Sequence, residues 1–411
     1  WASQGNCEWS FLKVLPYFRR LETDTDINDD FHGVDGPVPV RRFKFDEWQP
    51  FQKAFYEACL ESGFPGDEDM NHPDSTGVGP VPFNNINGVR MSTAVTYLDA
   101  ARHRLNLTIR GEALALRILF EGYRATGVEV ESGGQRFSVE GDEVVLAAGG
   151  IASPQILMLS GIGPGTQLRT LGIPVLMDLP GVGQNLRDHP LISLDLRVRD
   201  GYELDLTGPR MQAGLRYTAH LSTLRNDMQL FPYNYSGPGY GDPLGSAHPA
   251  GEVGVRLTGM LELAESSGEL RLRSADPHDH PVLDYRYLQH PDDLRRLREC
   301  VRLSQKLLKY QALDSIVKDW LSPSAADLAT DESLDSWLMR NVSTAQHTSG
   351  TCKMGPESDS MAVVDQYCRV RGVVGLRIAD LSVAPQVVRA NTNATAIMIG
   401  ERVSDFIRQG K

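Results

Sequence analysis

The chain has 411 residues, which is long for one hydrophobic core, so we expect at least two domains. Its net charge of -12, without a long Lys/Arg run, argues against a nucleic-acid partner. The five cysteines are widely spaced, which suggests neither a disulfide framework nor a metal site. No stretch reaches the ~20 apolar residues of a membrane helix. We therefore expect no membrane span, no metal and a cytoplasmic location.

Three helical patterns, separated by polar and Gly/Pro-rich loops, are found in the first hundred residues. Residues 8–20 form a short amphipathic pattern with a cap at Ser10, and residues 46–62 place apolar side chains at helical spacing. The Gly/Pro run at 63–66 ends the second pattern. Ser92 is the expected N-cap of a third helix that runs to about Ala101.

Short β-rich runs follow between residues 105 and 147, with a hairpin turn at Gly133-Gly134. The last run, Val144 to Ala148, is apolar without alternation, which predicts a strand of a parallel sheet that is covered on both faces. Ser153-Pro154 then predicts a helix with proline at its first position.

The pattern changes between residues 192 and 284, where short alternating runs and Gly/Pro/Ser-rich loops predict an antiparallel sheet. Helices are expected at 292–310 and 331–338. Two kinds of pattern therefore interleave, and the fold class is α/β plus α+β. The boundaries that we expect are 1–35, 87–190 and 340–411 for the α/β domain, and 36–86 and 191–339 for a domain inserted into it twice.

His347 is the first candidate for chemistry, because the small polar turn that follows it, Thr348 to Thr351, leaves room for a ligand. No second histidine or carboxylate stands at a metal-ligand spacing, so a zinc ligand is not expected. Two interpretations of His347 remain: a general base near neutral pH, or a histidine that is only structural or exposed. A nucleophilic Cys352 paired with His347 is an alternative, but it lacks an evident orienting third group.

A second candidate is the helix start at Asn391-Thr392-Asn393, which precedes a strong helical pattern. Two interpretations are open. The asparagine is a simple helix cap, or the free N–H groups of the first turn face an anionic or electron-accepting ligand.

Three stretches together resemble the glucose–methanol–choline (GMC) family of flavoprotein oxidoreductases. Residues 150–164 are similar to the family's second signature. His347 with residues 350–355 resembles its active-site histidine loop, and residues 376–380 with 391–394 resemble its C-terminal flavin-binding stretch. The resemblance implies FAD as cofactor and a small-molecule alcohol as substrate.

In this family a histidine, here His347, takes the hydroxyl proton while hydride passes to flavin N5. The matching second position is Asn391, which would hold the substrate oxygen. Asn393, with Thr392 beside it, matches the helix start that contacts the flavin ring. Two further matches concern the rest of the cofactor: Asp380 and Leu381 for the ribityl and pyrophosphate part, and the backbone of Ala115 for the adenine. The sheet of residues 191–339 would be the substrate domain.

One departure from the family is expected. Its N-terminal βαβ unit with a Gly-x-Gly-x-x-Gly turn is not found after Trp1, so the FAD-binding Rossmann-like domain is predicted to be incomplete. The unit would be absent from this sequence, supplied as a separate N-terminal fragment, or lost. Two other functions stay open: a flavin-containing hydroxynitrile-lyase-type enzyme, and a non-catalytic remnant without FAD.

Overall fold

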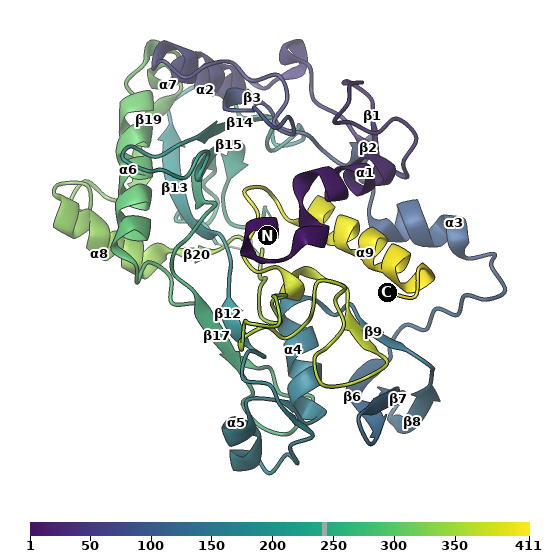
Figure 1. Ribbon diagram of the computed structural model, residues 1–411. Coiled ribbons are helices and arrows are strands. Elements are labelled where there is room, and N and C mark those ends of the chain that lie inside the picture. The colour runs from purple at the N-terminus through teal and green to yellow at the C-terminus, as the bar shows by residue number, and fades with distance from the viewer. Residues whose placement is uncertain (241–244) are drawn as a thin grey trace.

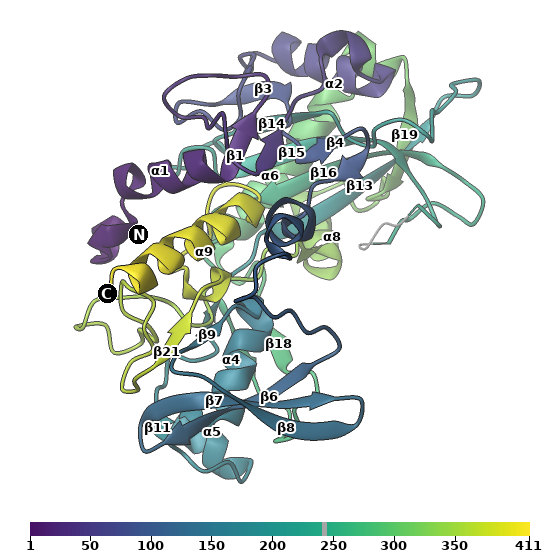
Figure 2. The same cartoon turned by 90° about the vertical axis from the view of Figure 1, so that its right-hand side faces the viewer.

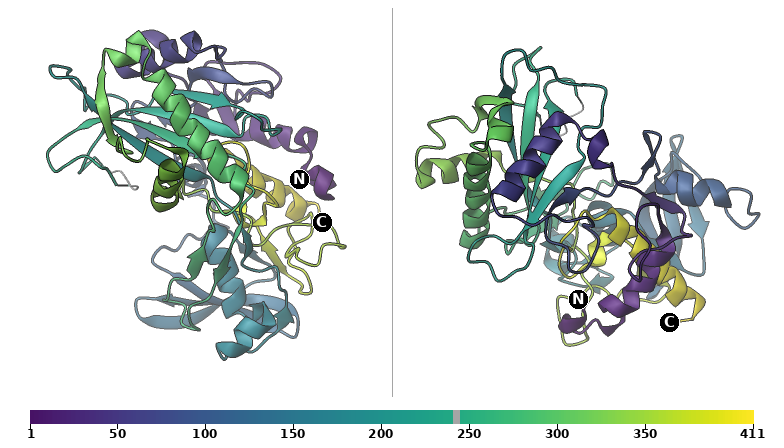
Figure 3. Two further views of the ribbon diagram at one scale, coloured as in Figure 1. Left: turned by 90° about the vertical axis from the view of Figure 1, so that its left-hand side faces the viewer. Right: turned by 90° about the horizontal axis from the view of Figure 1, so that it is seen from above.

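The computed structural model describes residues 1–240 and 245–411. Two lobes meet along the C-terminal helix α9 (Asn393–Arg408), which lies between them (Figures 1 and 3). The other helices are α1 (Phe11–Leu21), α2 (Pro50–Glu61), α3 (Asp99–Ala101), α4 (Gly149–Leu159), α5 (Gly165–Thr170), α6 (Pro291–Leu307), α7 (Gln311–Asp314) and α8 (Asp331–Asn341). Among the described residues, no helix combines the length and the apolar character that crossing a membrane requires.

One lobe is built on a seven-stranded antiparallel sheet in the order β19-β13-β16-β15-β14-β3, with β20 also on β13. Its alternating apolar residues pack against α2 and α6, so the sheet has one helix-covered face. The strands are β3 (Gly77–Pro80), β13 (Pro190–Val198), β14 (Ala213–Tyr217), β15 (Met228–Ser236), β16 (Gly254–Leu261), β19 (Val317–Ser322) and β20 (Ser343–Thr344). The antiparallel sheet predicted from residue 192 onward is therefore present.

The second lobe contains small sheets around another core. A three-stranded antiparallel sheet, β6-β7-β8, lies beside the parallel pair β9-β21 and helix α4 (Figure 2). The strands that make up these two sheets are β6 (Leu114–Glu121), β7 (Arg124–Ser132), β8 (Gln135–Glu140), β9 (Val144–Leu146) and β21 (Leu376–Ile378). The remaining short strands are β1 (Glu22–Asp24), β2 (Val38–Val40), β4 (Asn85–Ile86), β5 (Val89–Arg90), β10 (Ile162–Gly163), β11 (Met177–Asp178), β12 (Gln184–Leu186), β17 (Gly268–Arg271) and β18 (Val282–Asp284).

The prediction that β9 belongs to a parallel pair is confirmed, but the prediction that both its faces are covered is wrong. Val144 and Leu146 are buried in the core that contains α4, whereas Val145 is 41% exposed. Side chains alternate between the two faces of a strand, and here only one face packs against the core.

The boundary between the lobes also differs from the expected one. Residues 268–284 are expected in the inserted domain. In the structure β17 pairs with β12, and Leu270 lies in the core that contains α4, which belongs to the second lobe. Val38, expected in the inserted domain, also lies in that core, because β2 pairs with β1. Pairing between strands far apart in sequence decides these assignments, and local pattern does not contain it.

Helix α4 begins five residues earlier than predicted, so Pro154 is its sixth residue and not its first. A proline lacks the N–H that would bond the carbonyl four residues earlier, here that of Gly150. The hydroxyl of Thr351 donates to this carbonyl instead, at 2.7 Å. The loop that follows His347 is thereby tied to the first turn of α4.

Helix α9 packs along α1. This packing directs the N-terminal end of α9 toward the lobe of the seven-stranded sheet, which we call the sheet lobe (Figure 2). The guanidinium of Arg402 lies 4.8 to 5.9 Å from the ring centroids of Trp9, Tyr17 and Phe406. It also donates to the backbone carbonyl of Glu8. These contacts join the first residues of the chain to its last helix.

Candidate active site

The residues around His347 are organised by a buried carboxylate, Asp188, which is 4% exposed. Its Oδ1 accepts the backbone N–H groups of His189 at 2.8 Å and of His347 at 2.9 Å. Its Oδ2 accepts the hydroxyls of Tyr287, at 2.5 Å, and Thr344. Four donors converge on one carboxylate, so the backbone at His347 is held in place.

The imidazoles of His347 and His189 form a hydrogen-bonded pair. Their Nδ1 atoms are 2.8 Å apart, and Nε2 of His189 lies 2.8 Å from the carbonyl oxygen of Val388. A carbonyl can only accept, so Nε2 of His189 carries a proton and its Nδ1 is an acceptor. The proton between the rings then belongs to Nδ1 of His347. We assign the free lone pair of His347 to its Nε2.

Both histidines are neutral near pH 7. Burial lowers the pKa of His347 below its usual value, with partial compensation from the negative charge of Asp188. Burial and the neighbouring His347 ring lower the pKa of His189 to about 3. A neutral imidazole with a free Nε2 can accept a proton, which is the property of a general base.

The loop after His347 is fixed at several points. Thr348 Oγ1 lies 2.7 Å from the hydroxyl of Tyr285, and the N–H of Gly350 donates to the carbonyl of Leu381. Gly350 has a φ of +83°, and a Cβ there would stand 2.5 Å from the carbonyl oxygen of Asn185. Cys352 is fully buried and burial raises the pKa of its thiol well above the usual range, so the nucleophile hypothesis has no support.

Asp380 is engaged with the protein itself. Its Oδ2 accepts the N–H of Gly149 at 2.9 Å and the hydroxyl of Ser153 at 2.5 Å, and its Oδ1 accepts the N–H of Ser382. Leu381 begins the 3₁₀ turn that this carboxylate caps. Asp380 therefore fastens strand β21 to the first turn of α4.

The first turn of α9 is open. Thr392 is its N-cap residue and supplies no side-chain hydrogen bond, so neither Asn391 nor Asn393 caps the helix. Within the described residues, the first intrahelical bond runs from the N–H of Ala396 to the carbonyl of Thr392. The N–H groups of residues 393–395 are left as donors at the positive end of the helix dipole.

A cavity of about 550 Å³ lies at this helix end. Asn391 and Asn393 line it together with Met70, Arg216 and Phe231 from the sheet lobe. Neither His347 nor Ala115 belongs to its lining, and no hydrogen bond between described residues joins His347 to Asn391. The two predicted catalytic residues are connected through His189, which bonds Val388 three positions before Asn391. Ala115 lies on β6, opposite Val130.

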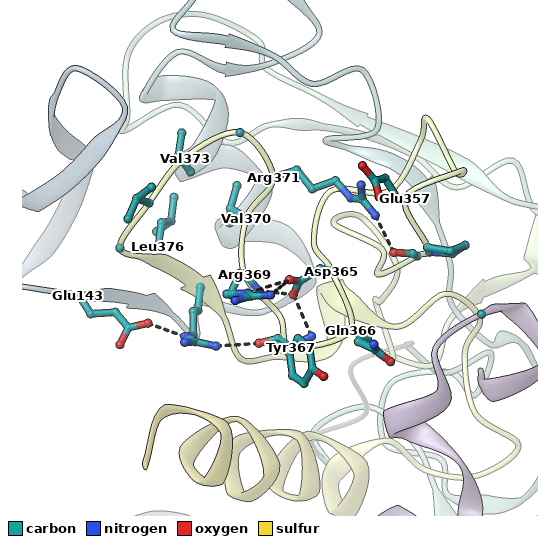
Figure 4. A pocket seen from close by; sticks show the side chains of 17 residues that line it. Glu143, Glu357, Asp365, Gln366, Tyr367, Arg369, Val370, Arg371, Val373 and Leu376 are labelled. Carbon is teal, nitrogen blue, oxygen red and sulfur yellow. Dashed lines mark hydrogen bonds and ion pairs between the residues drawn. The ribbon is translucent and has the colours of Figure 1, made fainter. Parts of the chain in front are cut away.

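Another cavity, of about 740 Å³, lies beside β21 (Figure 4). Four of its charged side chains are already paired, Arg377 with Glu143 and Arg369 with Asp365. It is lined by none of the predicted site residues, and we do not assign the chemistry to it.

Sequence reasoning missed Asp188 and His189. The signal was present in the dipeptide Asp188-His189 directly before Pro190, where a strand begins. Two adjacent titratable residues stand here directly before the apolar run Leu191-Ile192. Their partner in space is His347, 158 residues further along the chain, and nothing local points to it.

Comparisons with known proteins show the family and the fold of this chain. The N-terminal sequence model of the family "GMC oxidoreductase" matches residues 1–191, and the C-terminal one matches residues 264–400. The expectation that the family's N-terminal segment is missing is therefore not supported. The fold matches pyridoxine 4-oxidase from Mesorbium loti with a TM-score of 0.89, at 28% identity over 99% of this chain and 79% of that one.

Two curated relatives are similar to this chain in sequence over almost its whole length. A GMC-type oxidoreductase of Rhodococcus erythropolis is 37% identical, over 97% of this chain and 76% of the relative. An oxygen-dependent choline dehydrogenase of Photobacterium profundum is 36% identical, over 99% of this chain and 75% of the relative. The chain belongs to the GMC oxidoreductase family, whose cofactor is FAD.

Proposed function

We propose that this protein oxidises an alcohol, with His347 as the general base and Asn391 as a binding group for the substrate oxygen. The observation that carries the proposal is the hydrogen-bond chain from Val388 through His189 to His347. It leaves Nε2 of His347 as the nitrogen with a free lone pair. Asparagine has no basic group, so Asn391 can orient a hydroxyl but cannot deprotonate it.

The open end of α9 supports the flavin assignment. Donor N–H groups at the positive end of a helix stabilise negative charge, and these groups adjoin a cavity lined by Asn391 and Asn393. The residues present fit a ring system that becomes electron-rich on reduction. Bound FAD supplies the hydride acceptor for the reaction.

The protein's own groups perform the remaining work. Nε2 of His347 accepts the hydroxyl proton, Asp188 fixes the backbone of that histidine, and Asn391 donates to the substrate oxygen. Asp380 holds the end of β21 against α4, and the carbonyl of Leu381 accepts the N–H of Gly350; both residues would support the part of the cofactor near the ribityl chain. Thr392 and Asn393 would hold the ring, and we propose the β6 backbone at Ala115 for the adenine.

The reductive step can be measured by mixing the holoenzyme with alcohols of different classes without oxygen and following flavin bleaching. His347→Ala should slow bleaching by roughly 10²–10⁴-fold, the usual contribution of a general base. His103→Ala is the matched control, because His103 is exposed and far along the chain from the site. Unchanged bleaching by the His347 variant would refute the base assignment.

Asn391→Ala tests the second role. It should raise KM and lower kcat together, since the oriented hydroxyl is needed both in binding and in the transition state. A kcat and KM equal to those of the parent enzyme would remove Asn391 from the site. Cyanide release from a cyanohydrin, without flavin reduction by any alcohol, would support the lyase reaction instead.

A further inference from the structure

Glu262 is a buried carboxyl group with no role in the site described so far. It directly follows β16, is completely buried, and its backbone N–H donates to the carbonyl of Asp227 at 2.8 Å. Within the described part of the chain, neither of its carboxyl oxygens has a hydrogen-bond partner. Burying such a group without partners costs stability, so its presence calls for a reason.

This carboxyl lies beside the imidazole of His189. Oε2 of Glu262 lies 3.5 Å from Nε2 of His189, the nitrogen that carries a proton. On the far side of the same imidazole, Nδ1 meets His347. Glu262, His189 and His347 therefore form one row, with the free Nε2 of His347 at the end that faces the substrate in the proposed reaction.

We propose that Glu262 is the internal proton acceptor of this row, a positioning residue that acts on His347 through His189. The proposal rests on the proposed role of His347 as the base. It adds a group inside the protein that finally accepts a proton when His347 takes the hydroxyl proton of the substrate. This group is separated from the substrate by the two imidazoles of His347 and His189.

The transfer balances without any further reactant. Nε2 of His347 takes the hydroxyl proton while its Nδ1 proton passes to Nδ1 of His189. The Nε2 proton of His189 leaves the Val388 carbonyl and passes to Oε2 of Glu262. Both imidazoles end neutral in the opposite tautomer, the carboxylate becomes a carboxylic acid, and the hydride leaves with the two electrons of the C–H bond.

The order of basicity favours this direction. Burial lowers the pKa of His189 to about 3, so an imidazolium there is unstable. Burial raises the pKa of Glu262 to about 8, with the charge of Arg216 acting in the opposite direction. In this row the carboxylate is more basic than the imidazole beside it, and the proton ends on the carboxylate.

The relay needs Glu262 to be ionised before the substrate reacts. Among the residues that the structure describes, the charged or titratable groups around it are Arg216 from β14 and His189, with Asp188 and His347 beyond the imidazole. His347 titrates below its usual pKa and stays neutral above about pH 7. A rise in rate with pH through the region of 8 therefore belongs to Glu262 and not to the base itself.

Two measurements test the relay. Rapid-mixing kinetics should show alcohol-driven flavin bleaching that rises about tenfold between about pH 7 and pH 9, as the ionised fraction of a group with pKa near 8 requires. Glu262→Gln should remove this rise, and Glu262→Asp should restore part of it. Glu265→Gln, three residues away and exposed, is the matched control and should keep the parent profile.

The second readout is independent of turnover. Infrared difference spectra between low and high pH should show a buried carboxylic acid that ionises near pH 8 in the parent protein and is missing in Glu262→Gln. A parent-like pH rise in Glu262→Gln, or no such carboxyl band in the parent, overturns the relay. Unchanged bleaching in His347→Ala overturns the proposed base instead, so the two failures are distinguishable.

Discussion

Replacing Asp188 tests how the base is held, because two substitutions separate shape from charge. Oδ1 serves the two backbone N–H groups and Oδ2 serves the two hydroxyls. In Asp188→Asn the amide oxygen can keep both N–H groups, and the amide nitrogen can donate to hydroxyls that turn to accept. In Asp188→Ala the two N–H donors of His189 and His347 lose their acceptor.

The magnitudes follow from this division. A hydrogen bond to a charged group contributes about 1.5–3 kcal/mol, so two orphaned backbone donors make Asp188→Ala less stable by about 3–6 kcal/mol. Asp188→Asn loses only the charge assistance of its bonds, which amounts to about 1–3 kcal/mol in total. The larger loss is a substantial part of a typical unfolding free energy of about 5–15 kcal/mol.

Urea unfolding of the three proteins measures these differences. The reasoning would be refuted by an alanine variant as stable as the asparagine variant, since the orphaned donors would then cost nothing. A second effect concerns acidity: the charge of Asp188 raises the pKa of His347, so Asp188→Asn should lower it further. The low-pH limb of flavin bleaching should move to lower pH, and a shift to higher pH would contradict the assignment.

Three other substitutions have definite outcomes. Ser153→Ala removes the 2.5 Å bond to Asp380 and should lower the free energy of unfolding by about 1–3 kcal/mol in urea titrations. Three surrounding carboxylates raise the pKa of His32 from 6.5 to about 11. Because the pKa is higher in the folded than in the unfolded protein, the protonated imidazole stabilises the fold fully below about pH 6.5, and this stabilisation is lost as the pH rises toward 11. His32→Gln should flatten that decline in unfolding free energy, and an unchanged slope would contradict the ion pairs. Glu262→Leu should raise the free energy of unfolding by about 1–3 kcal/mol, and the melting temperature with it, because it removes a buried carboxyl that has no hydrogen-bond partner among the described residues, while it slows flavin bleaching; a lower melting temperature would show that the carboxyl has a stabilising partner.

Much of the local structure was predictable from the sequence. The helices α1, α2, α6 and α8 and the antiparallel character of the sheet follow from periodic burial and from turn residues, which are short-range properties. The predicted helix near residues 92–101 is present as a π-helical turn, Ala94–Leu98, followed by α3. The start of α4 was misjudged, because the hydroxyl that compensates for Pro154 comes from Thr351, almost two hundred residues later.

The candidate site shows the same division between local and distant information. His347 and the open helix start at Asn391–Asn393 lie in stretches whose small, polar or helical character is visible locally. The sequence by itself therefore determined the family resemblance and the two segments that we propose for the site.

Only the tertiary structure decided which groups act on His347. Strand β20 pairs with the start of β13, Thr344 opposite Pro190, and this register brings Asp188 and His189 beside His347. The turn after β16 then places Glu262 behind His189. Sheet register is set by the packing of whole strands on a shared core, so these contacts leave no trace in any single stretch of residues.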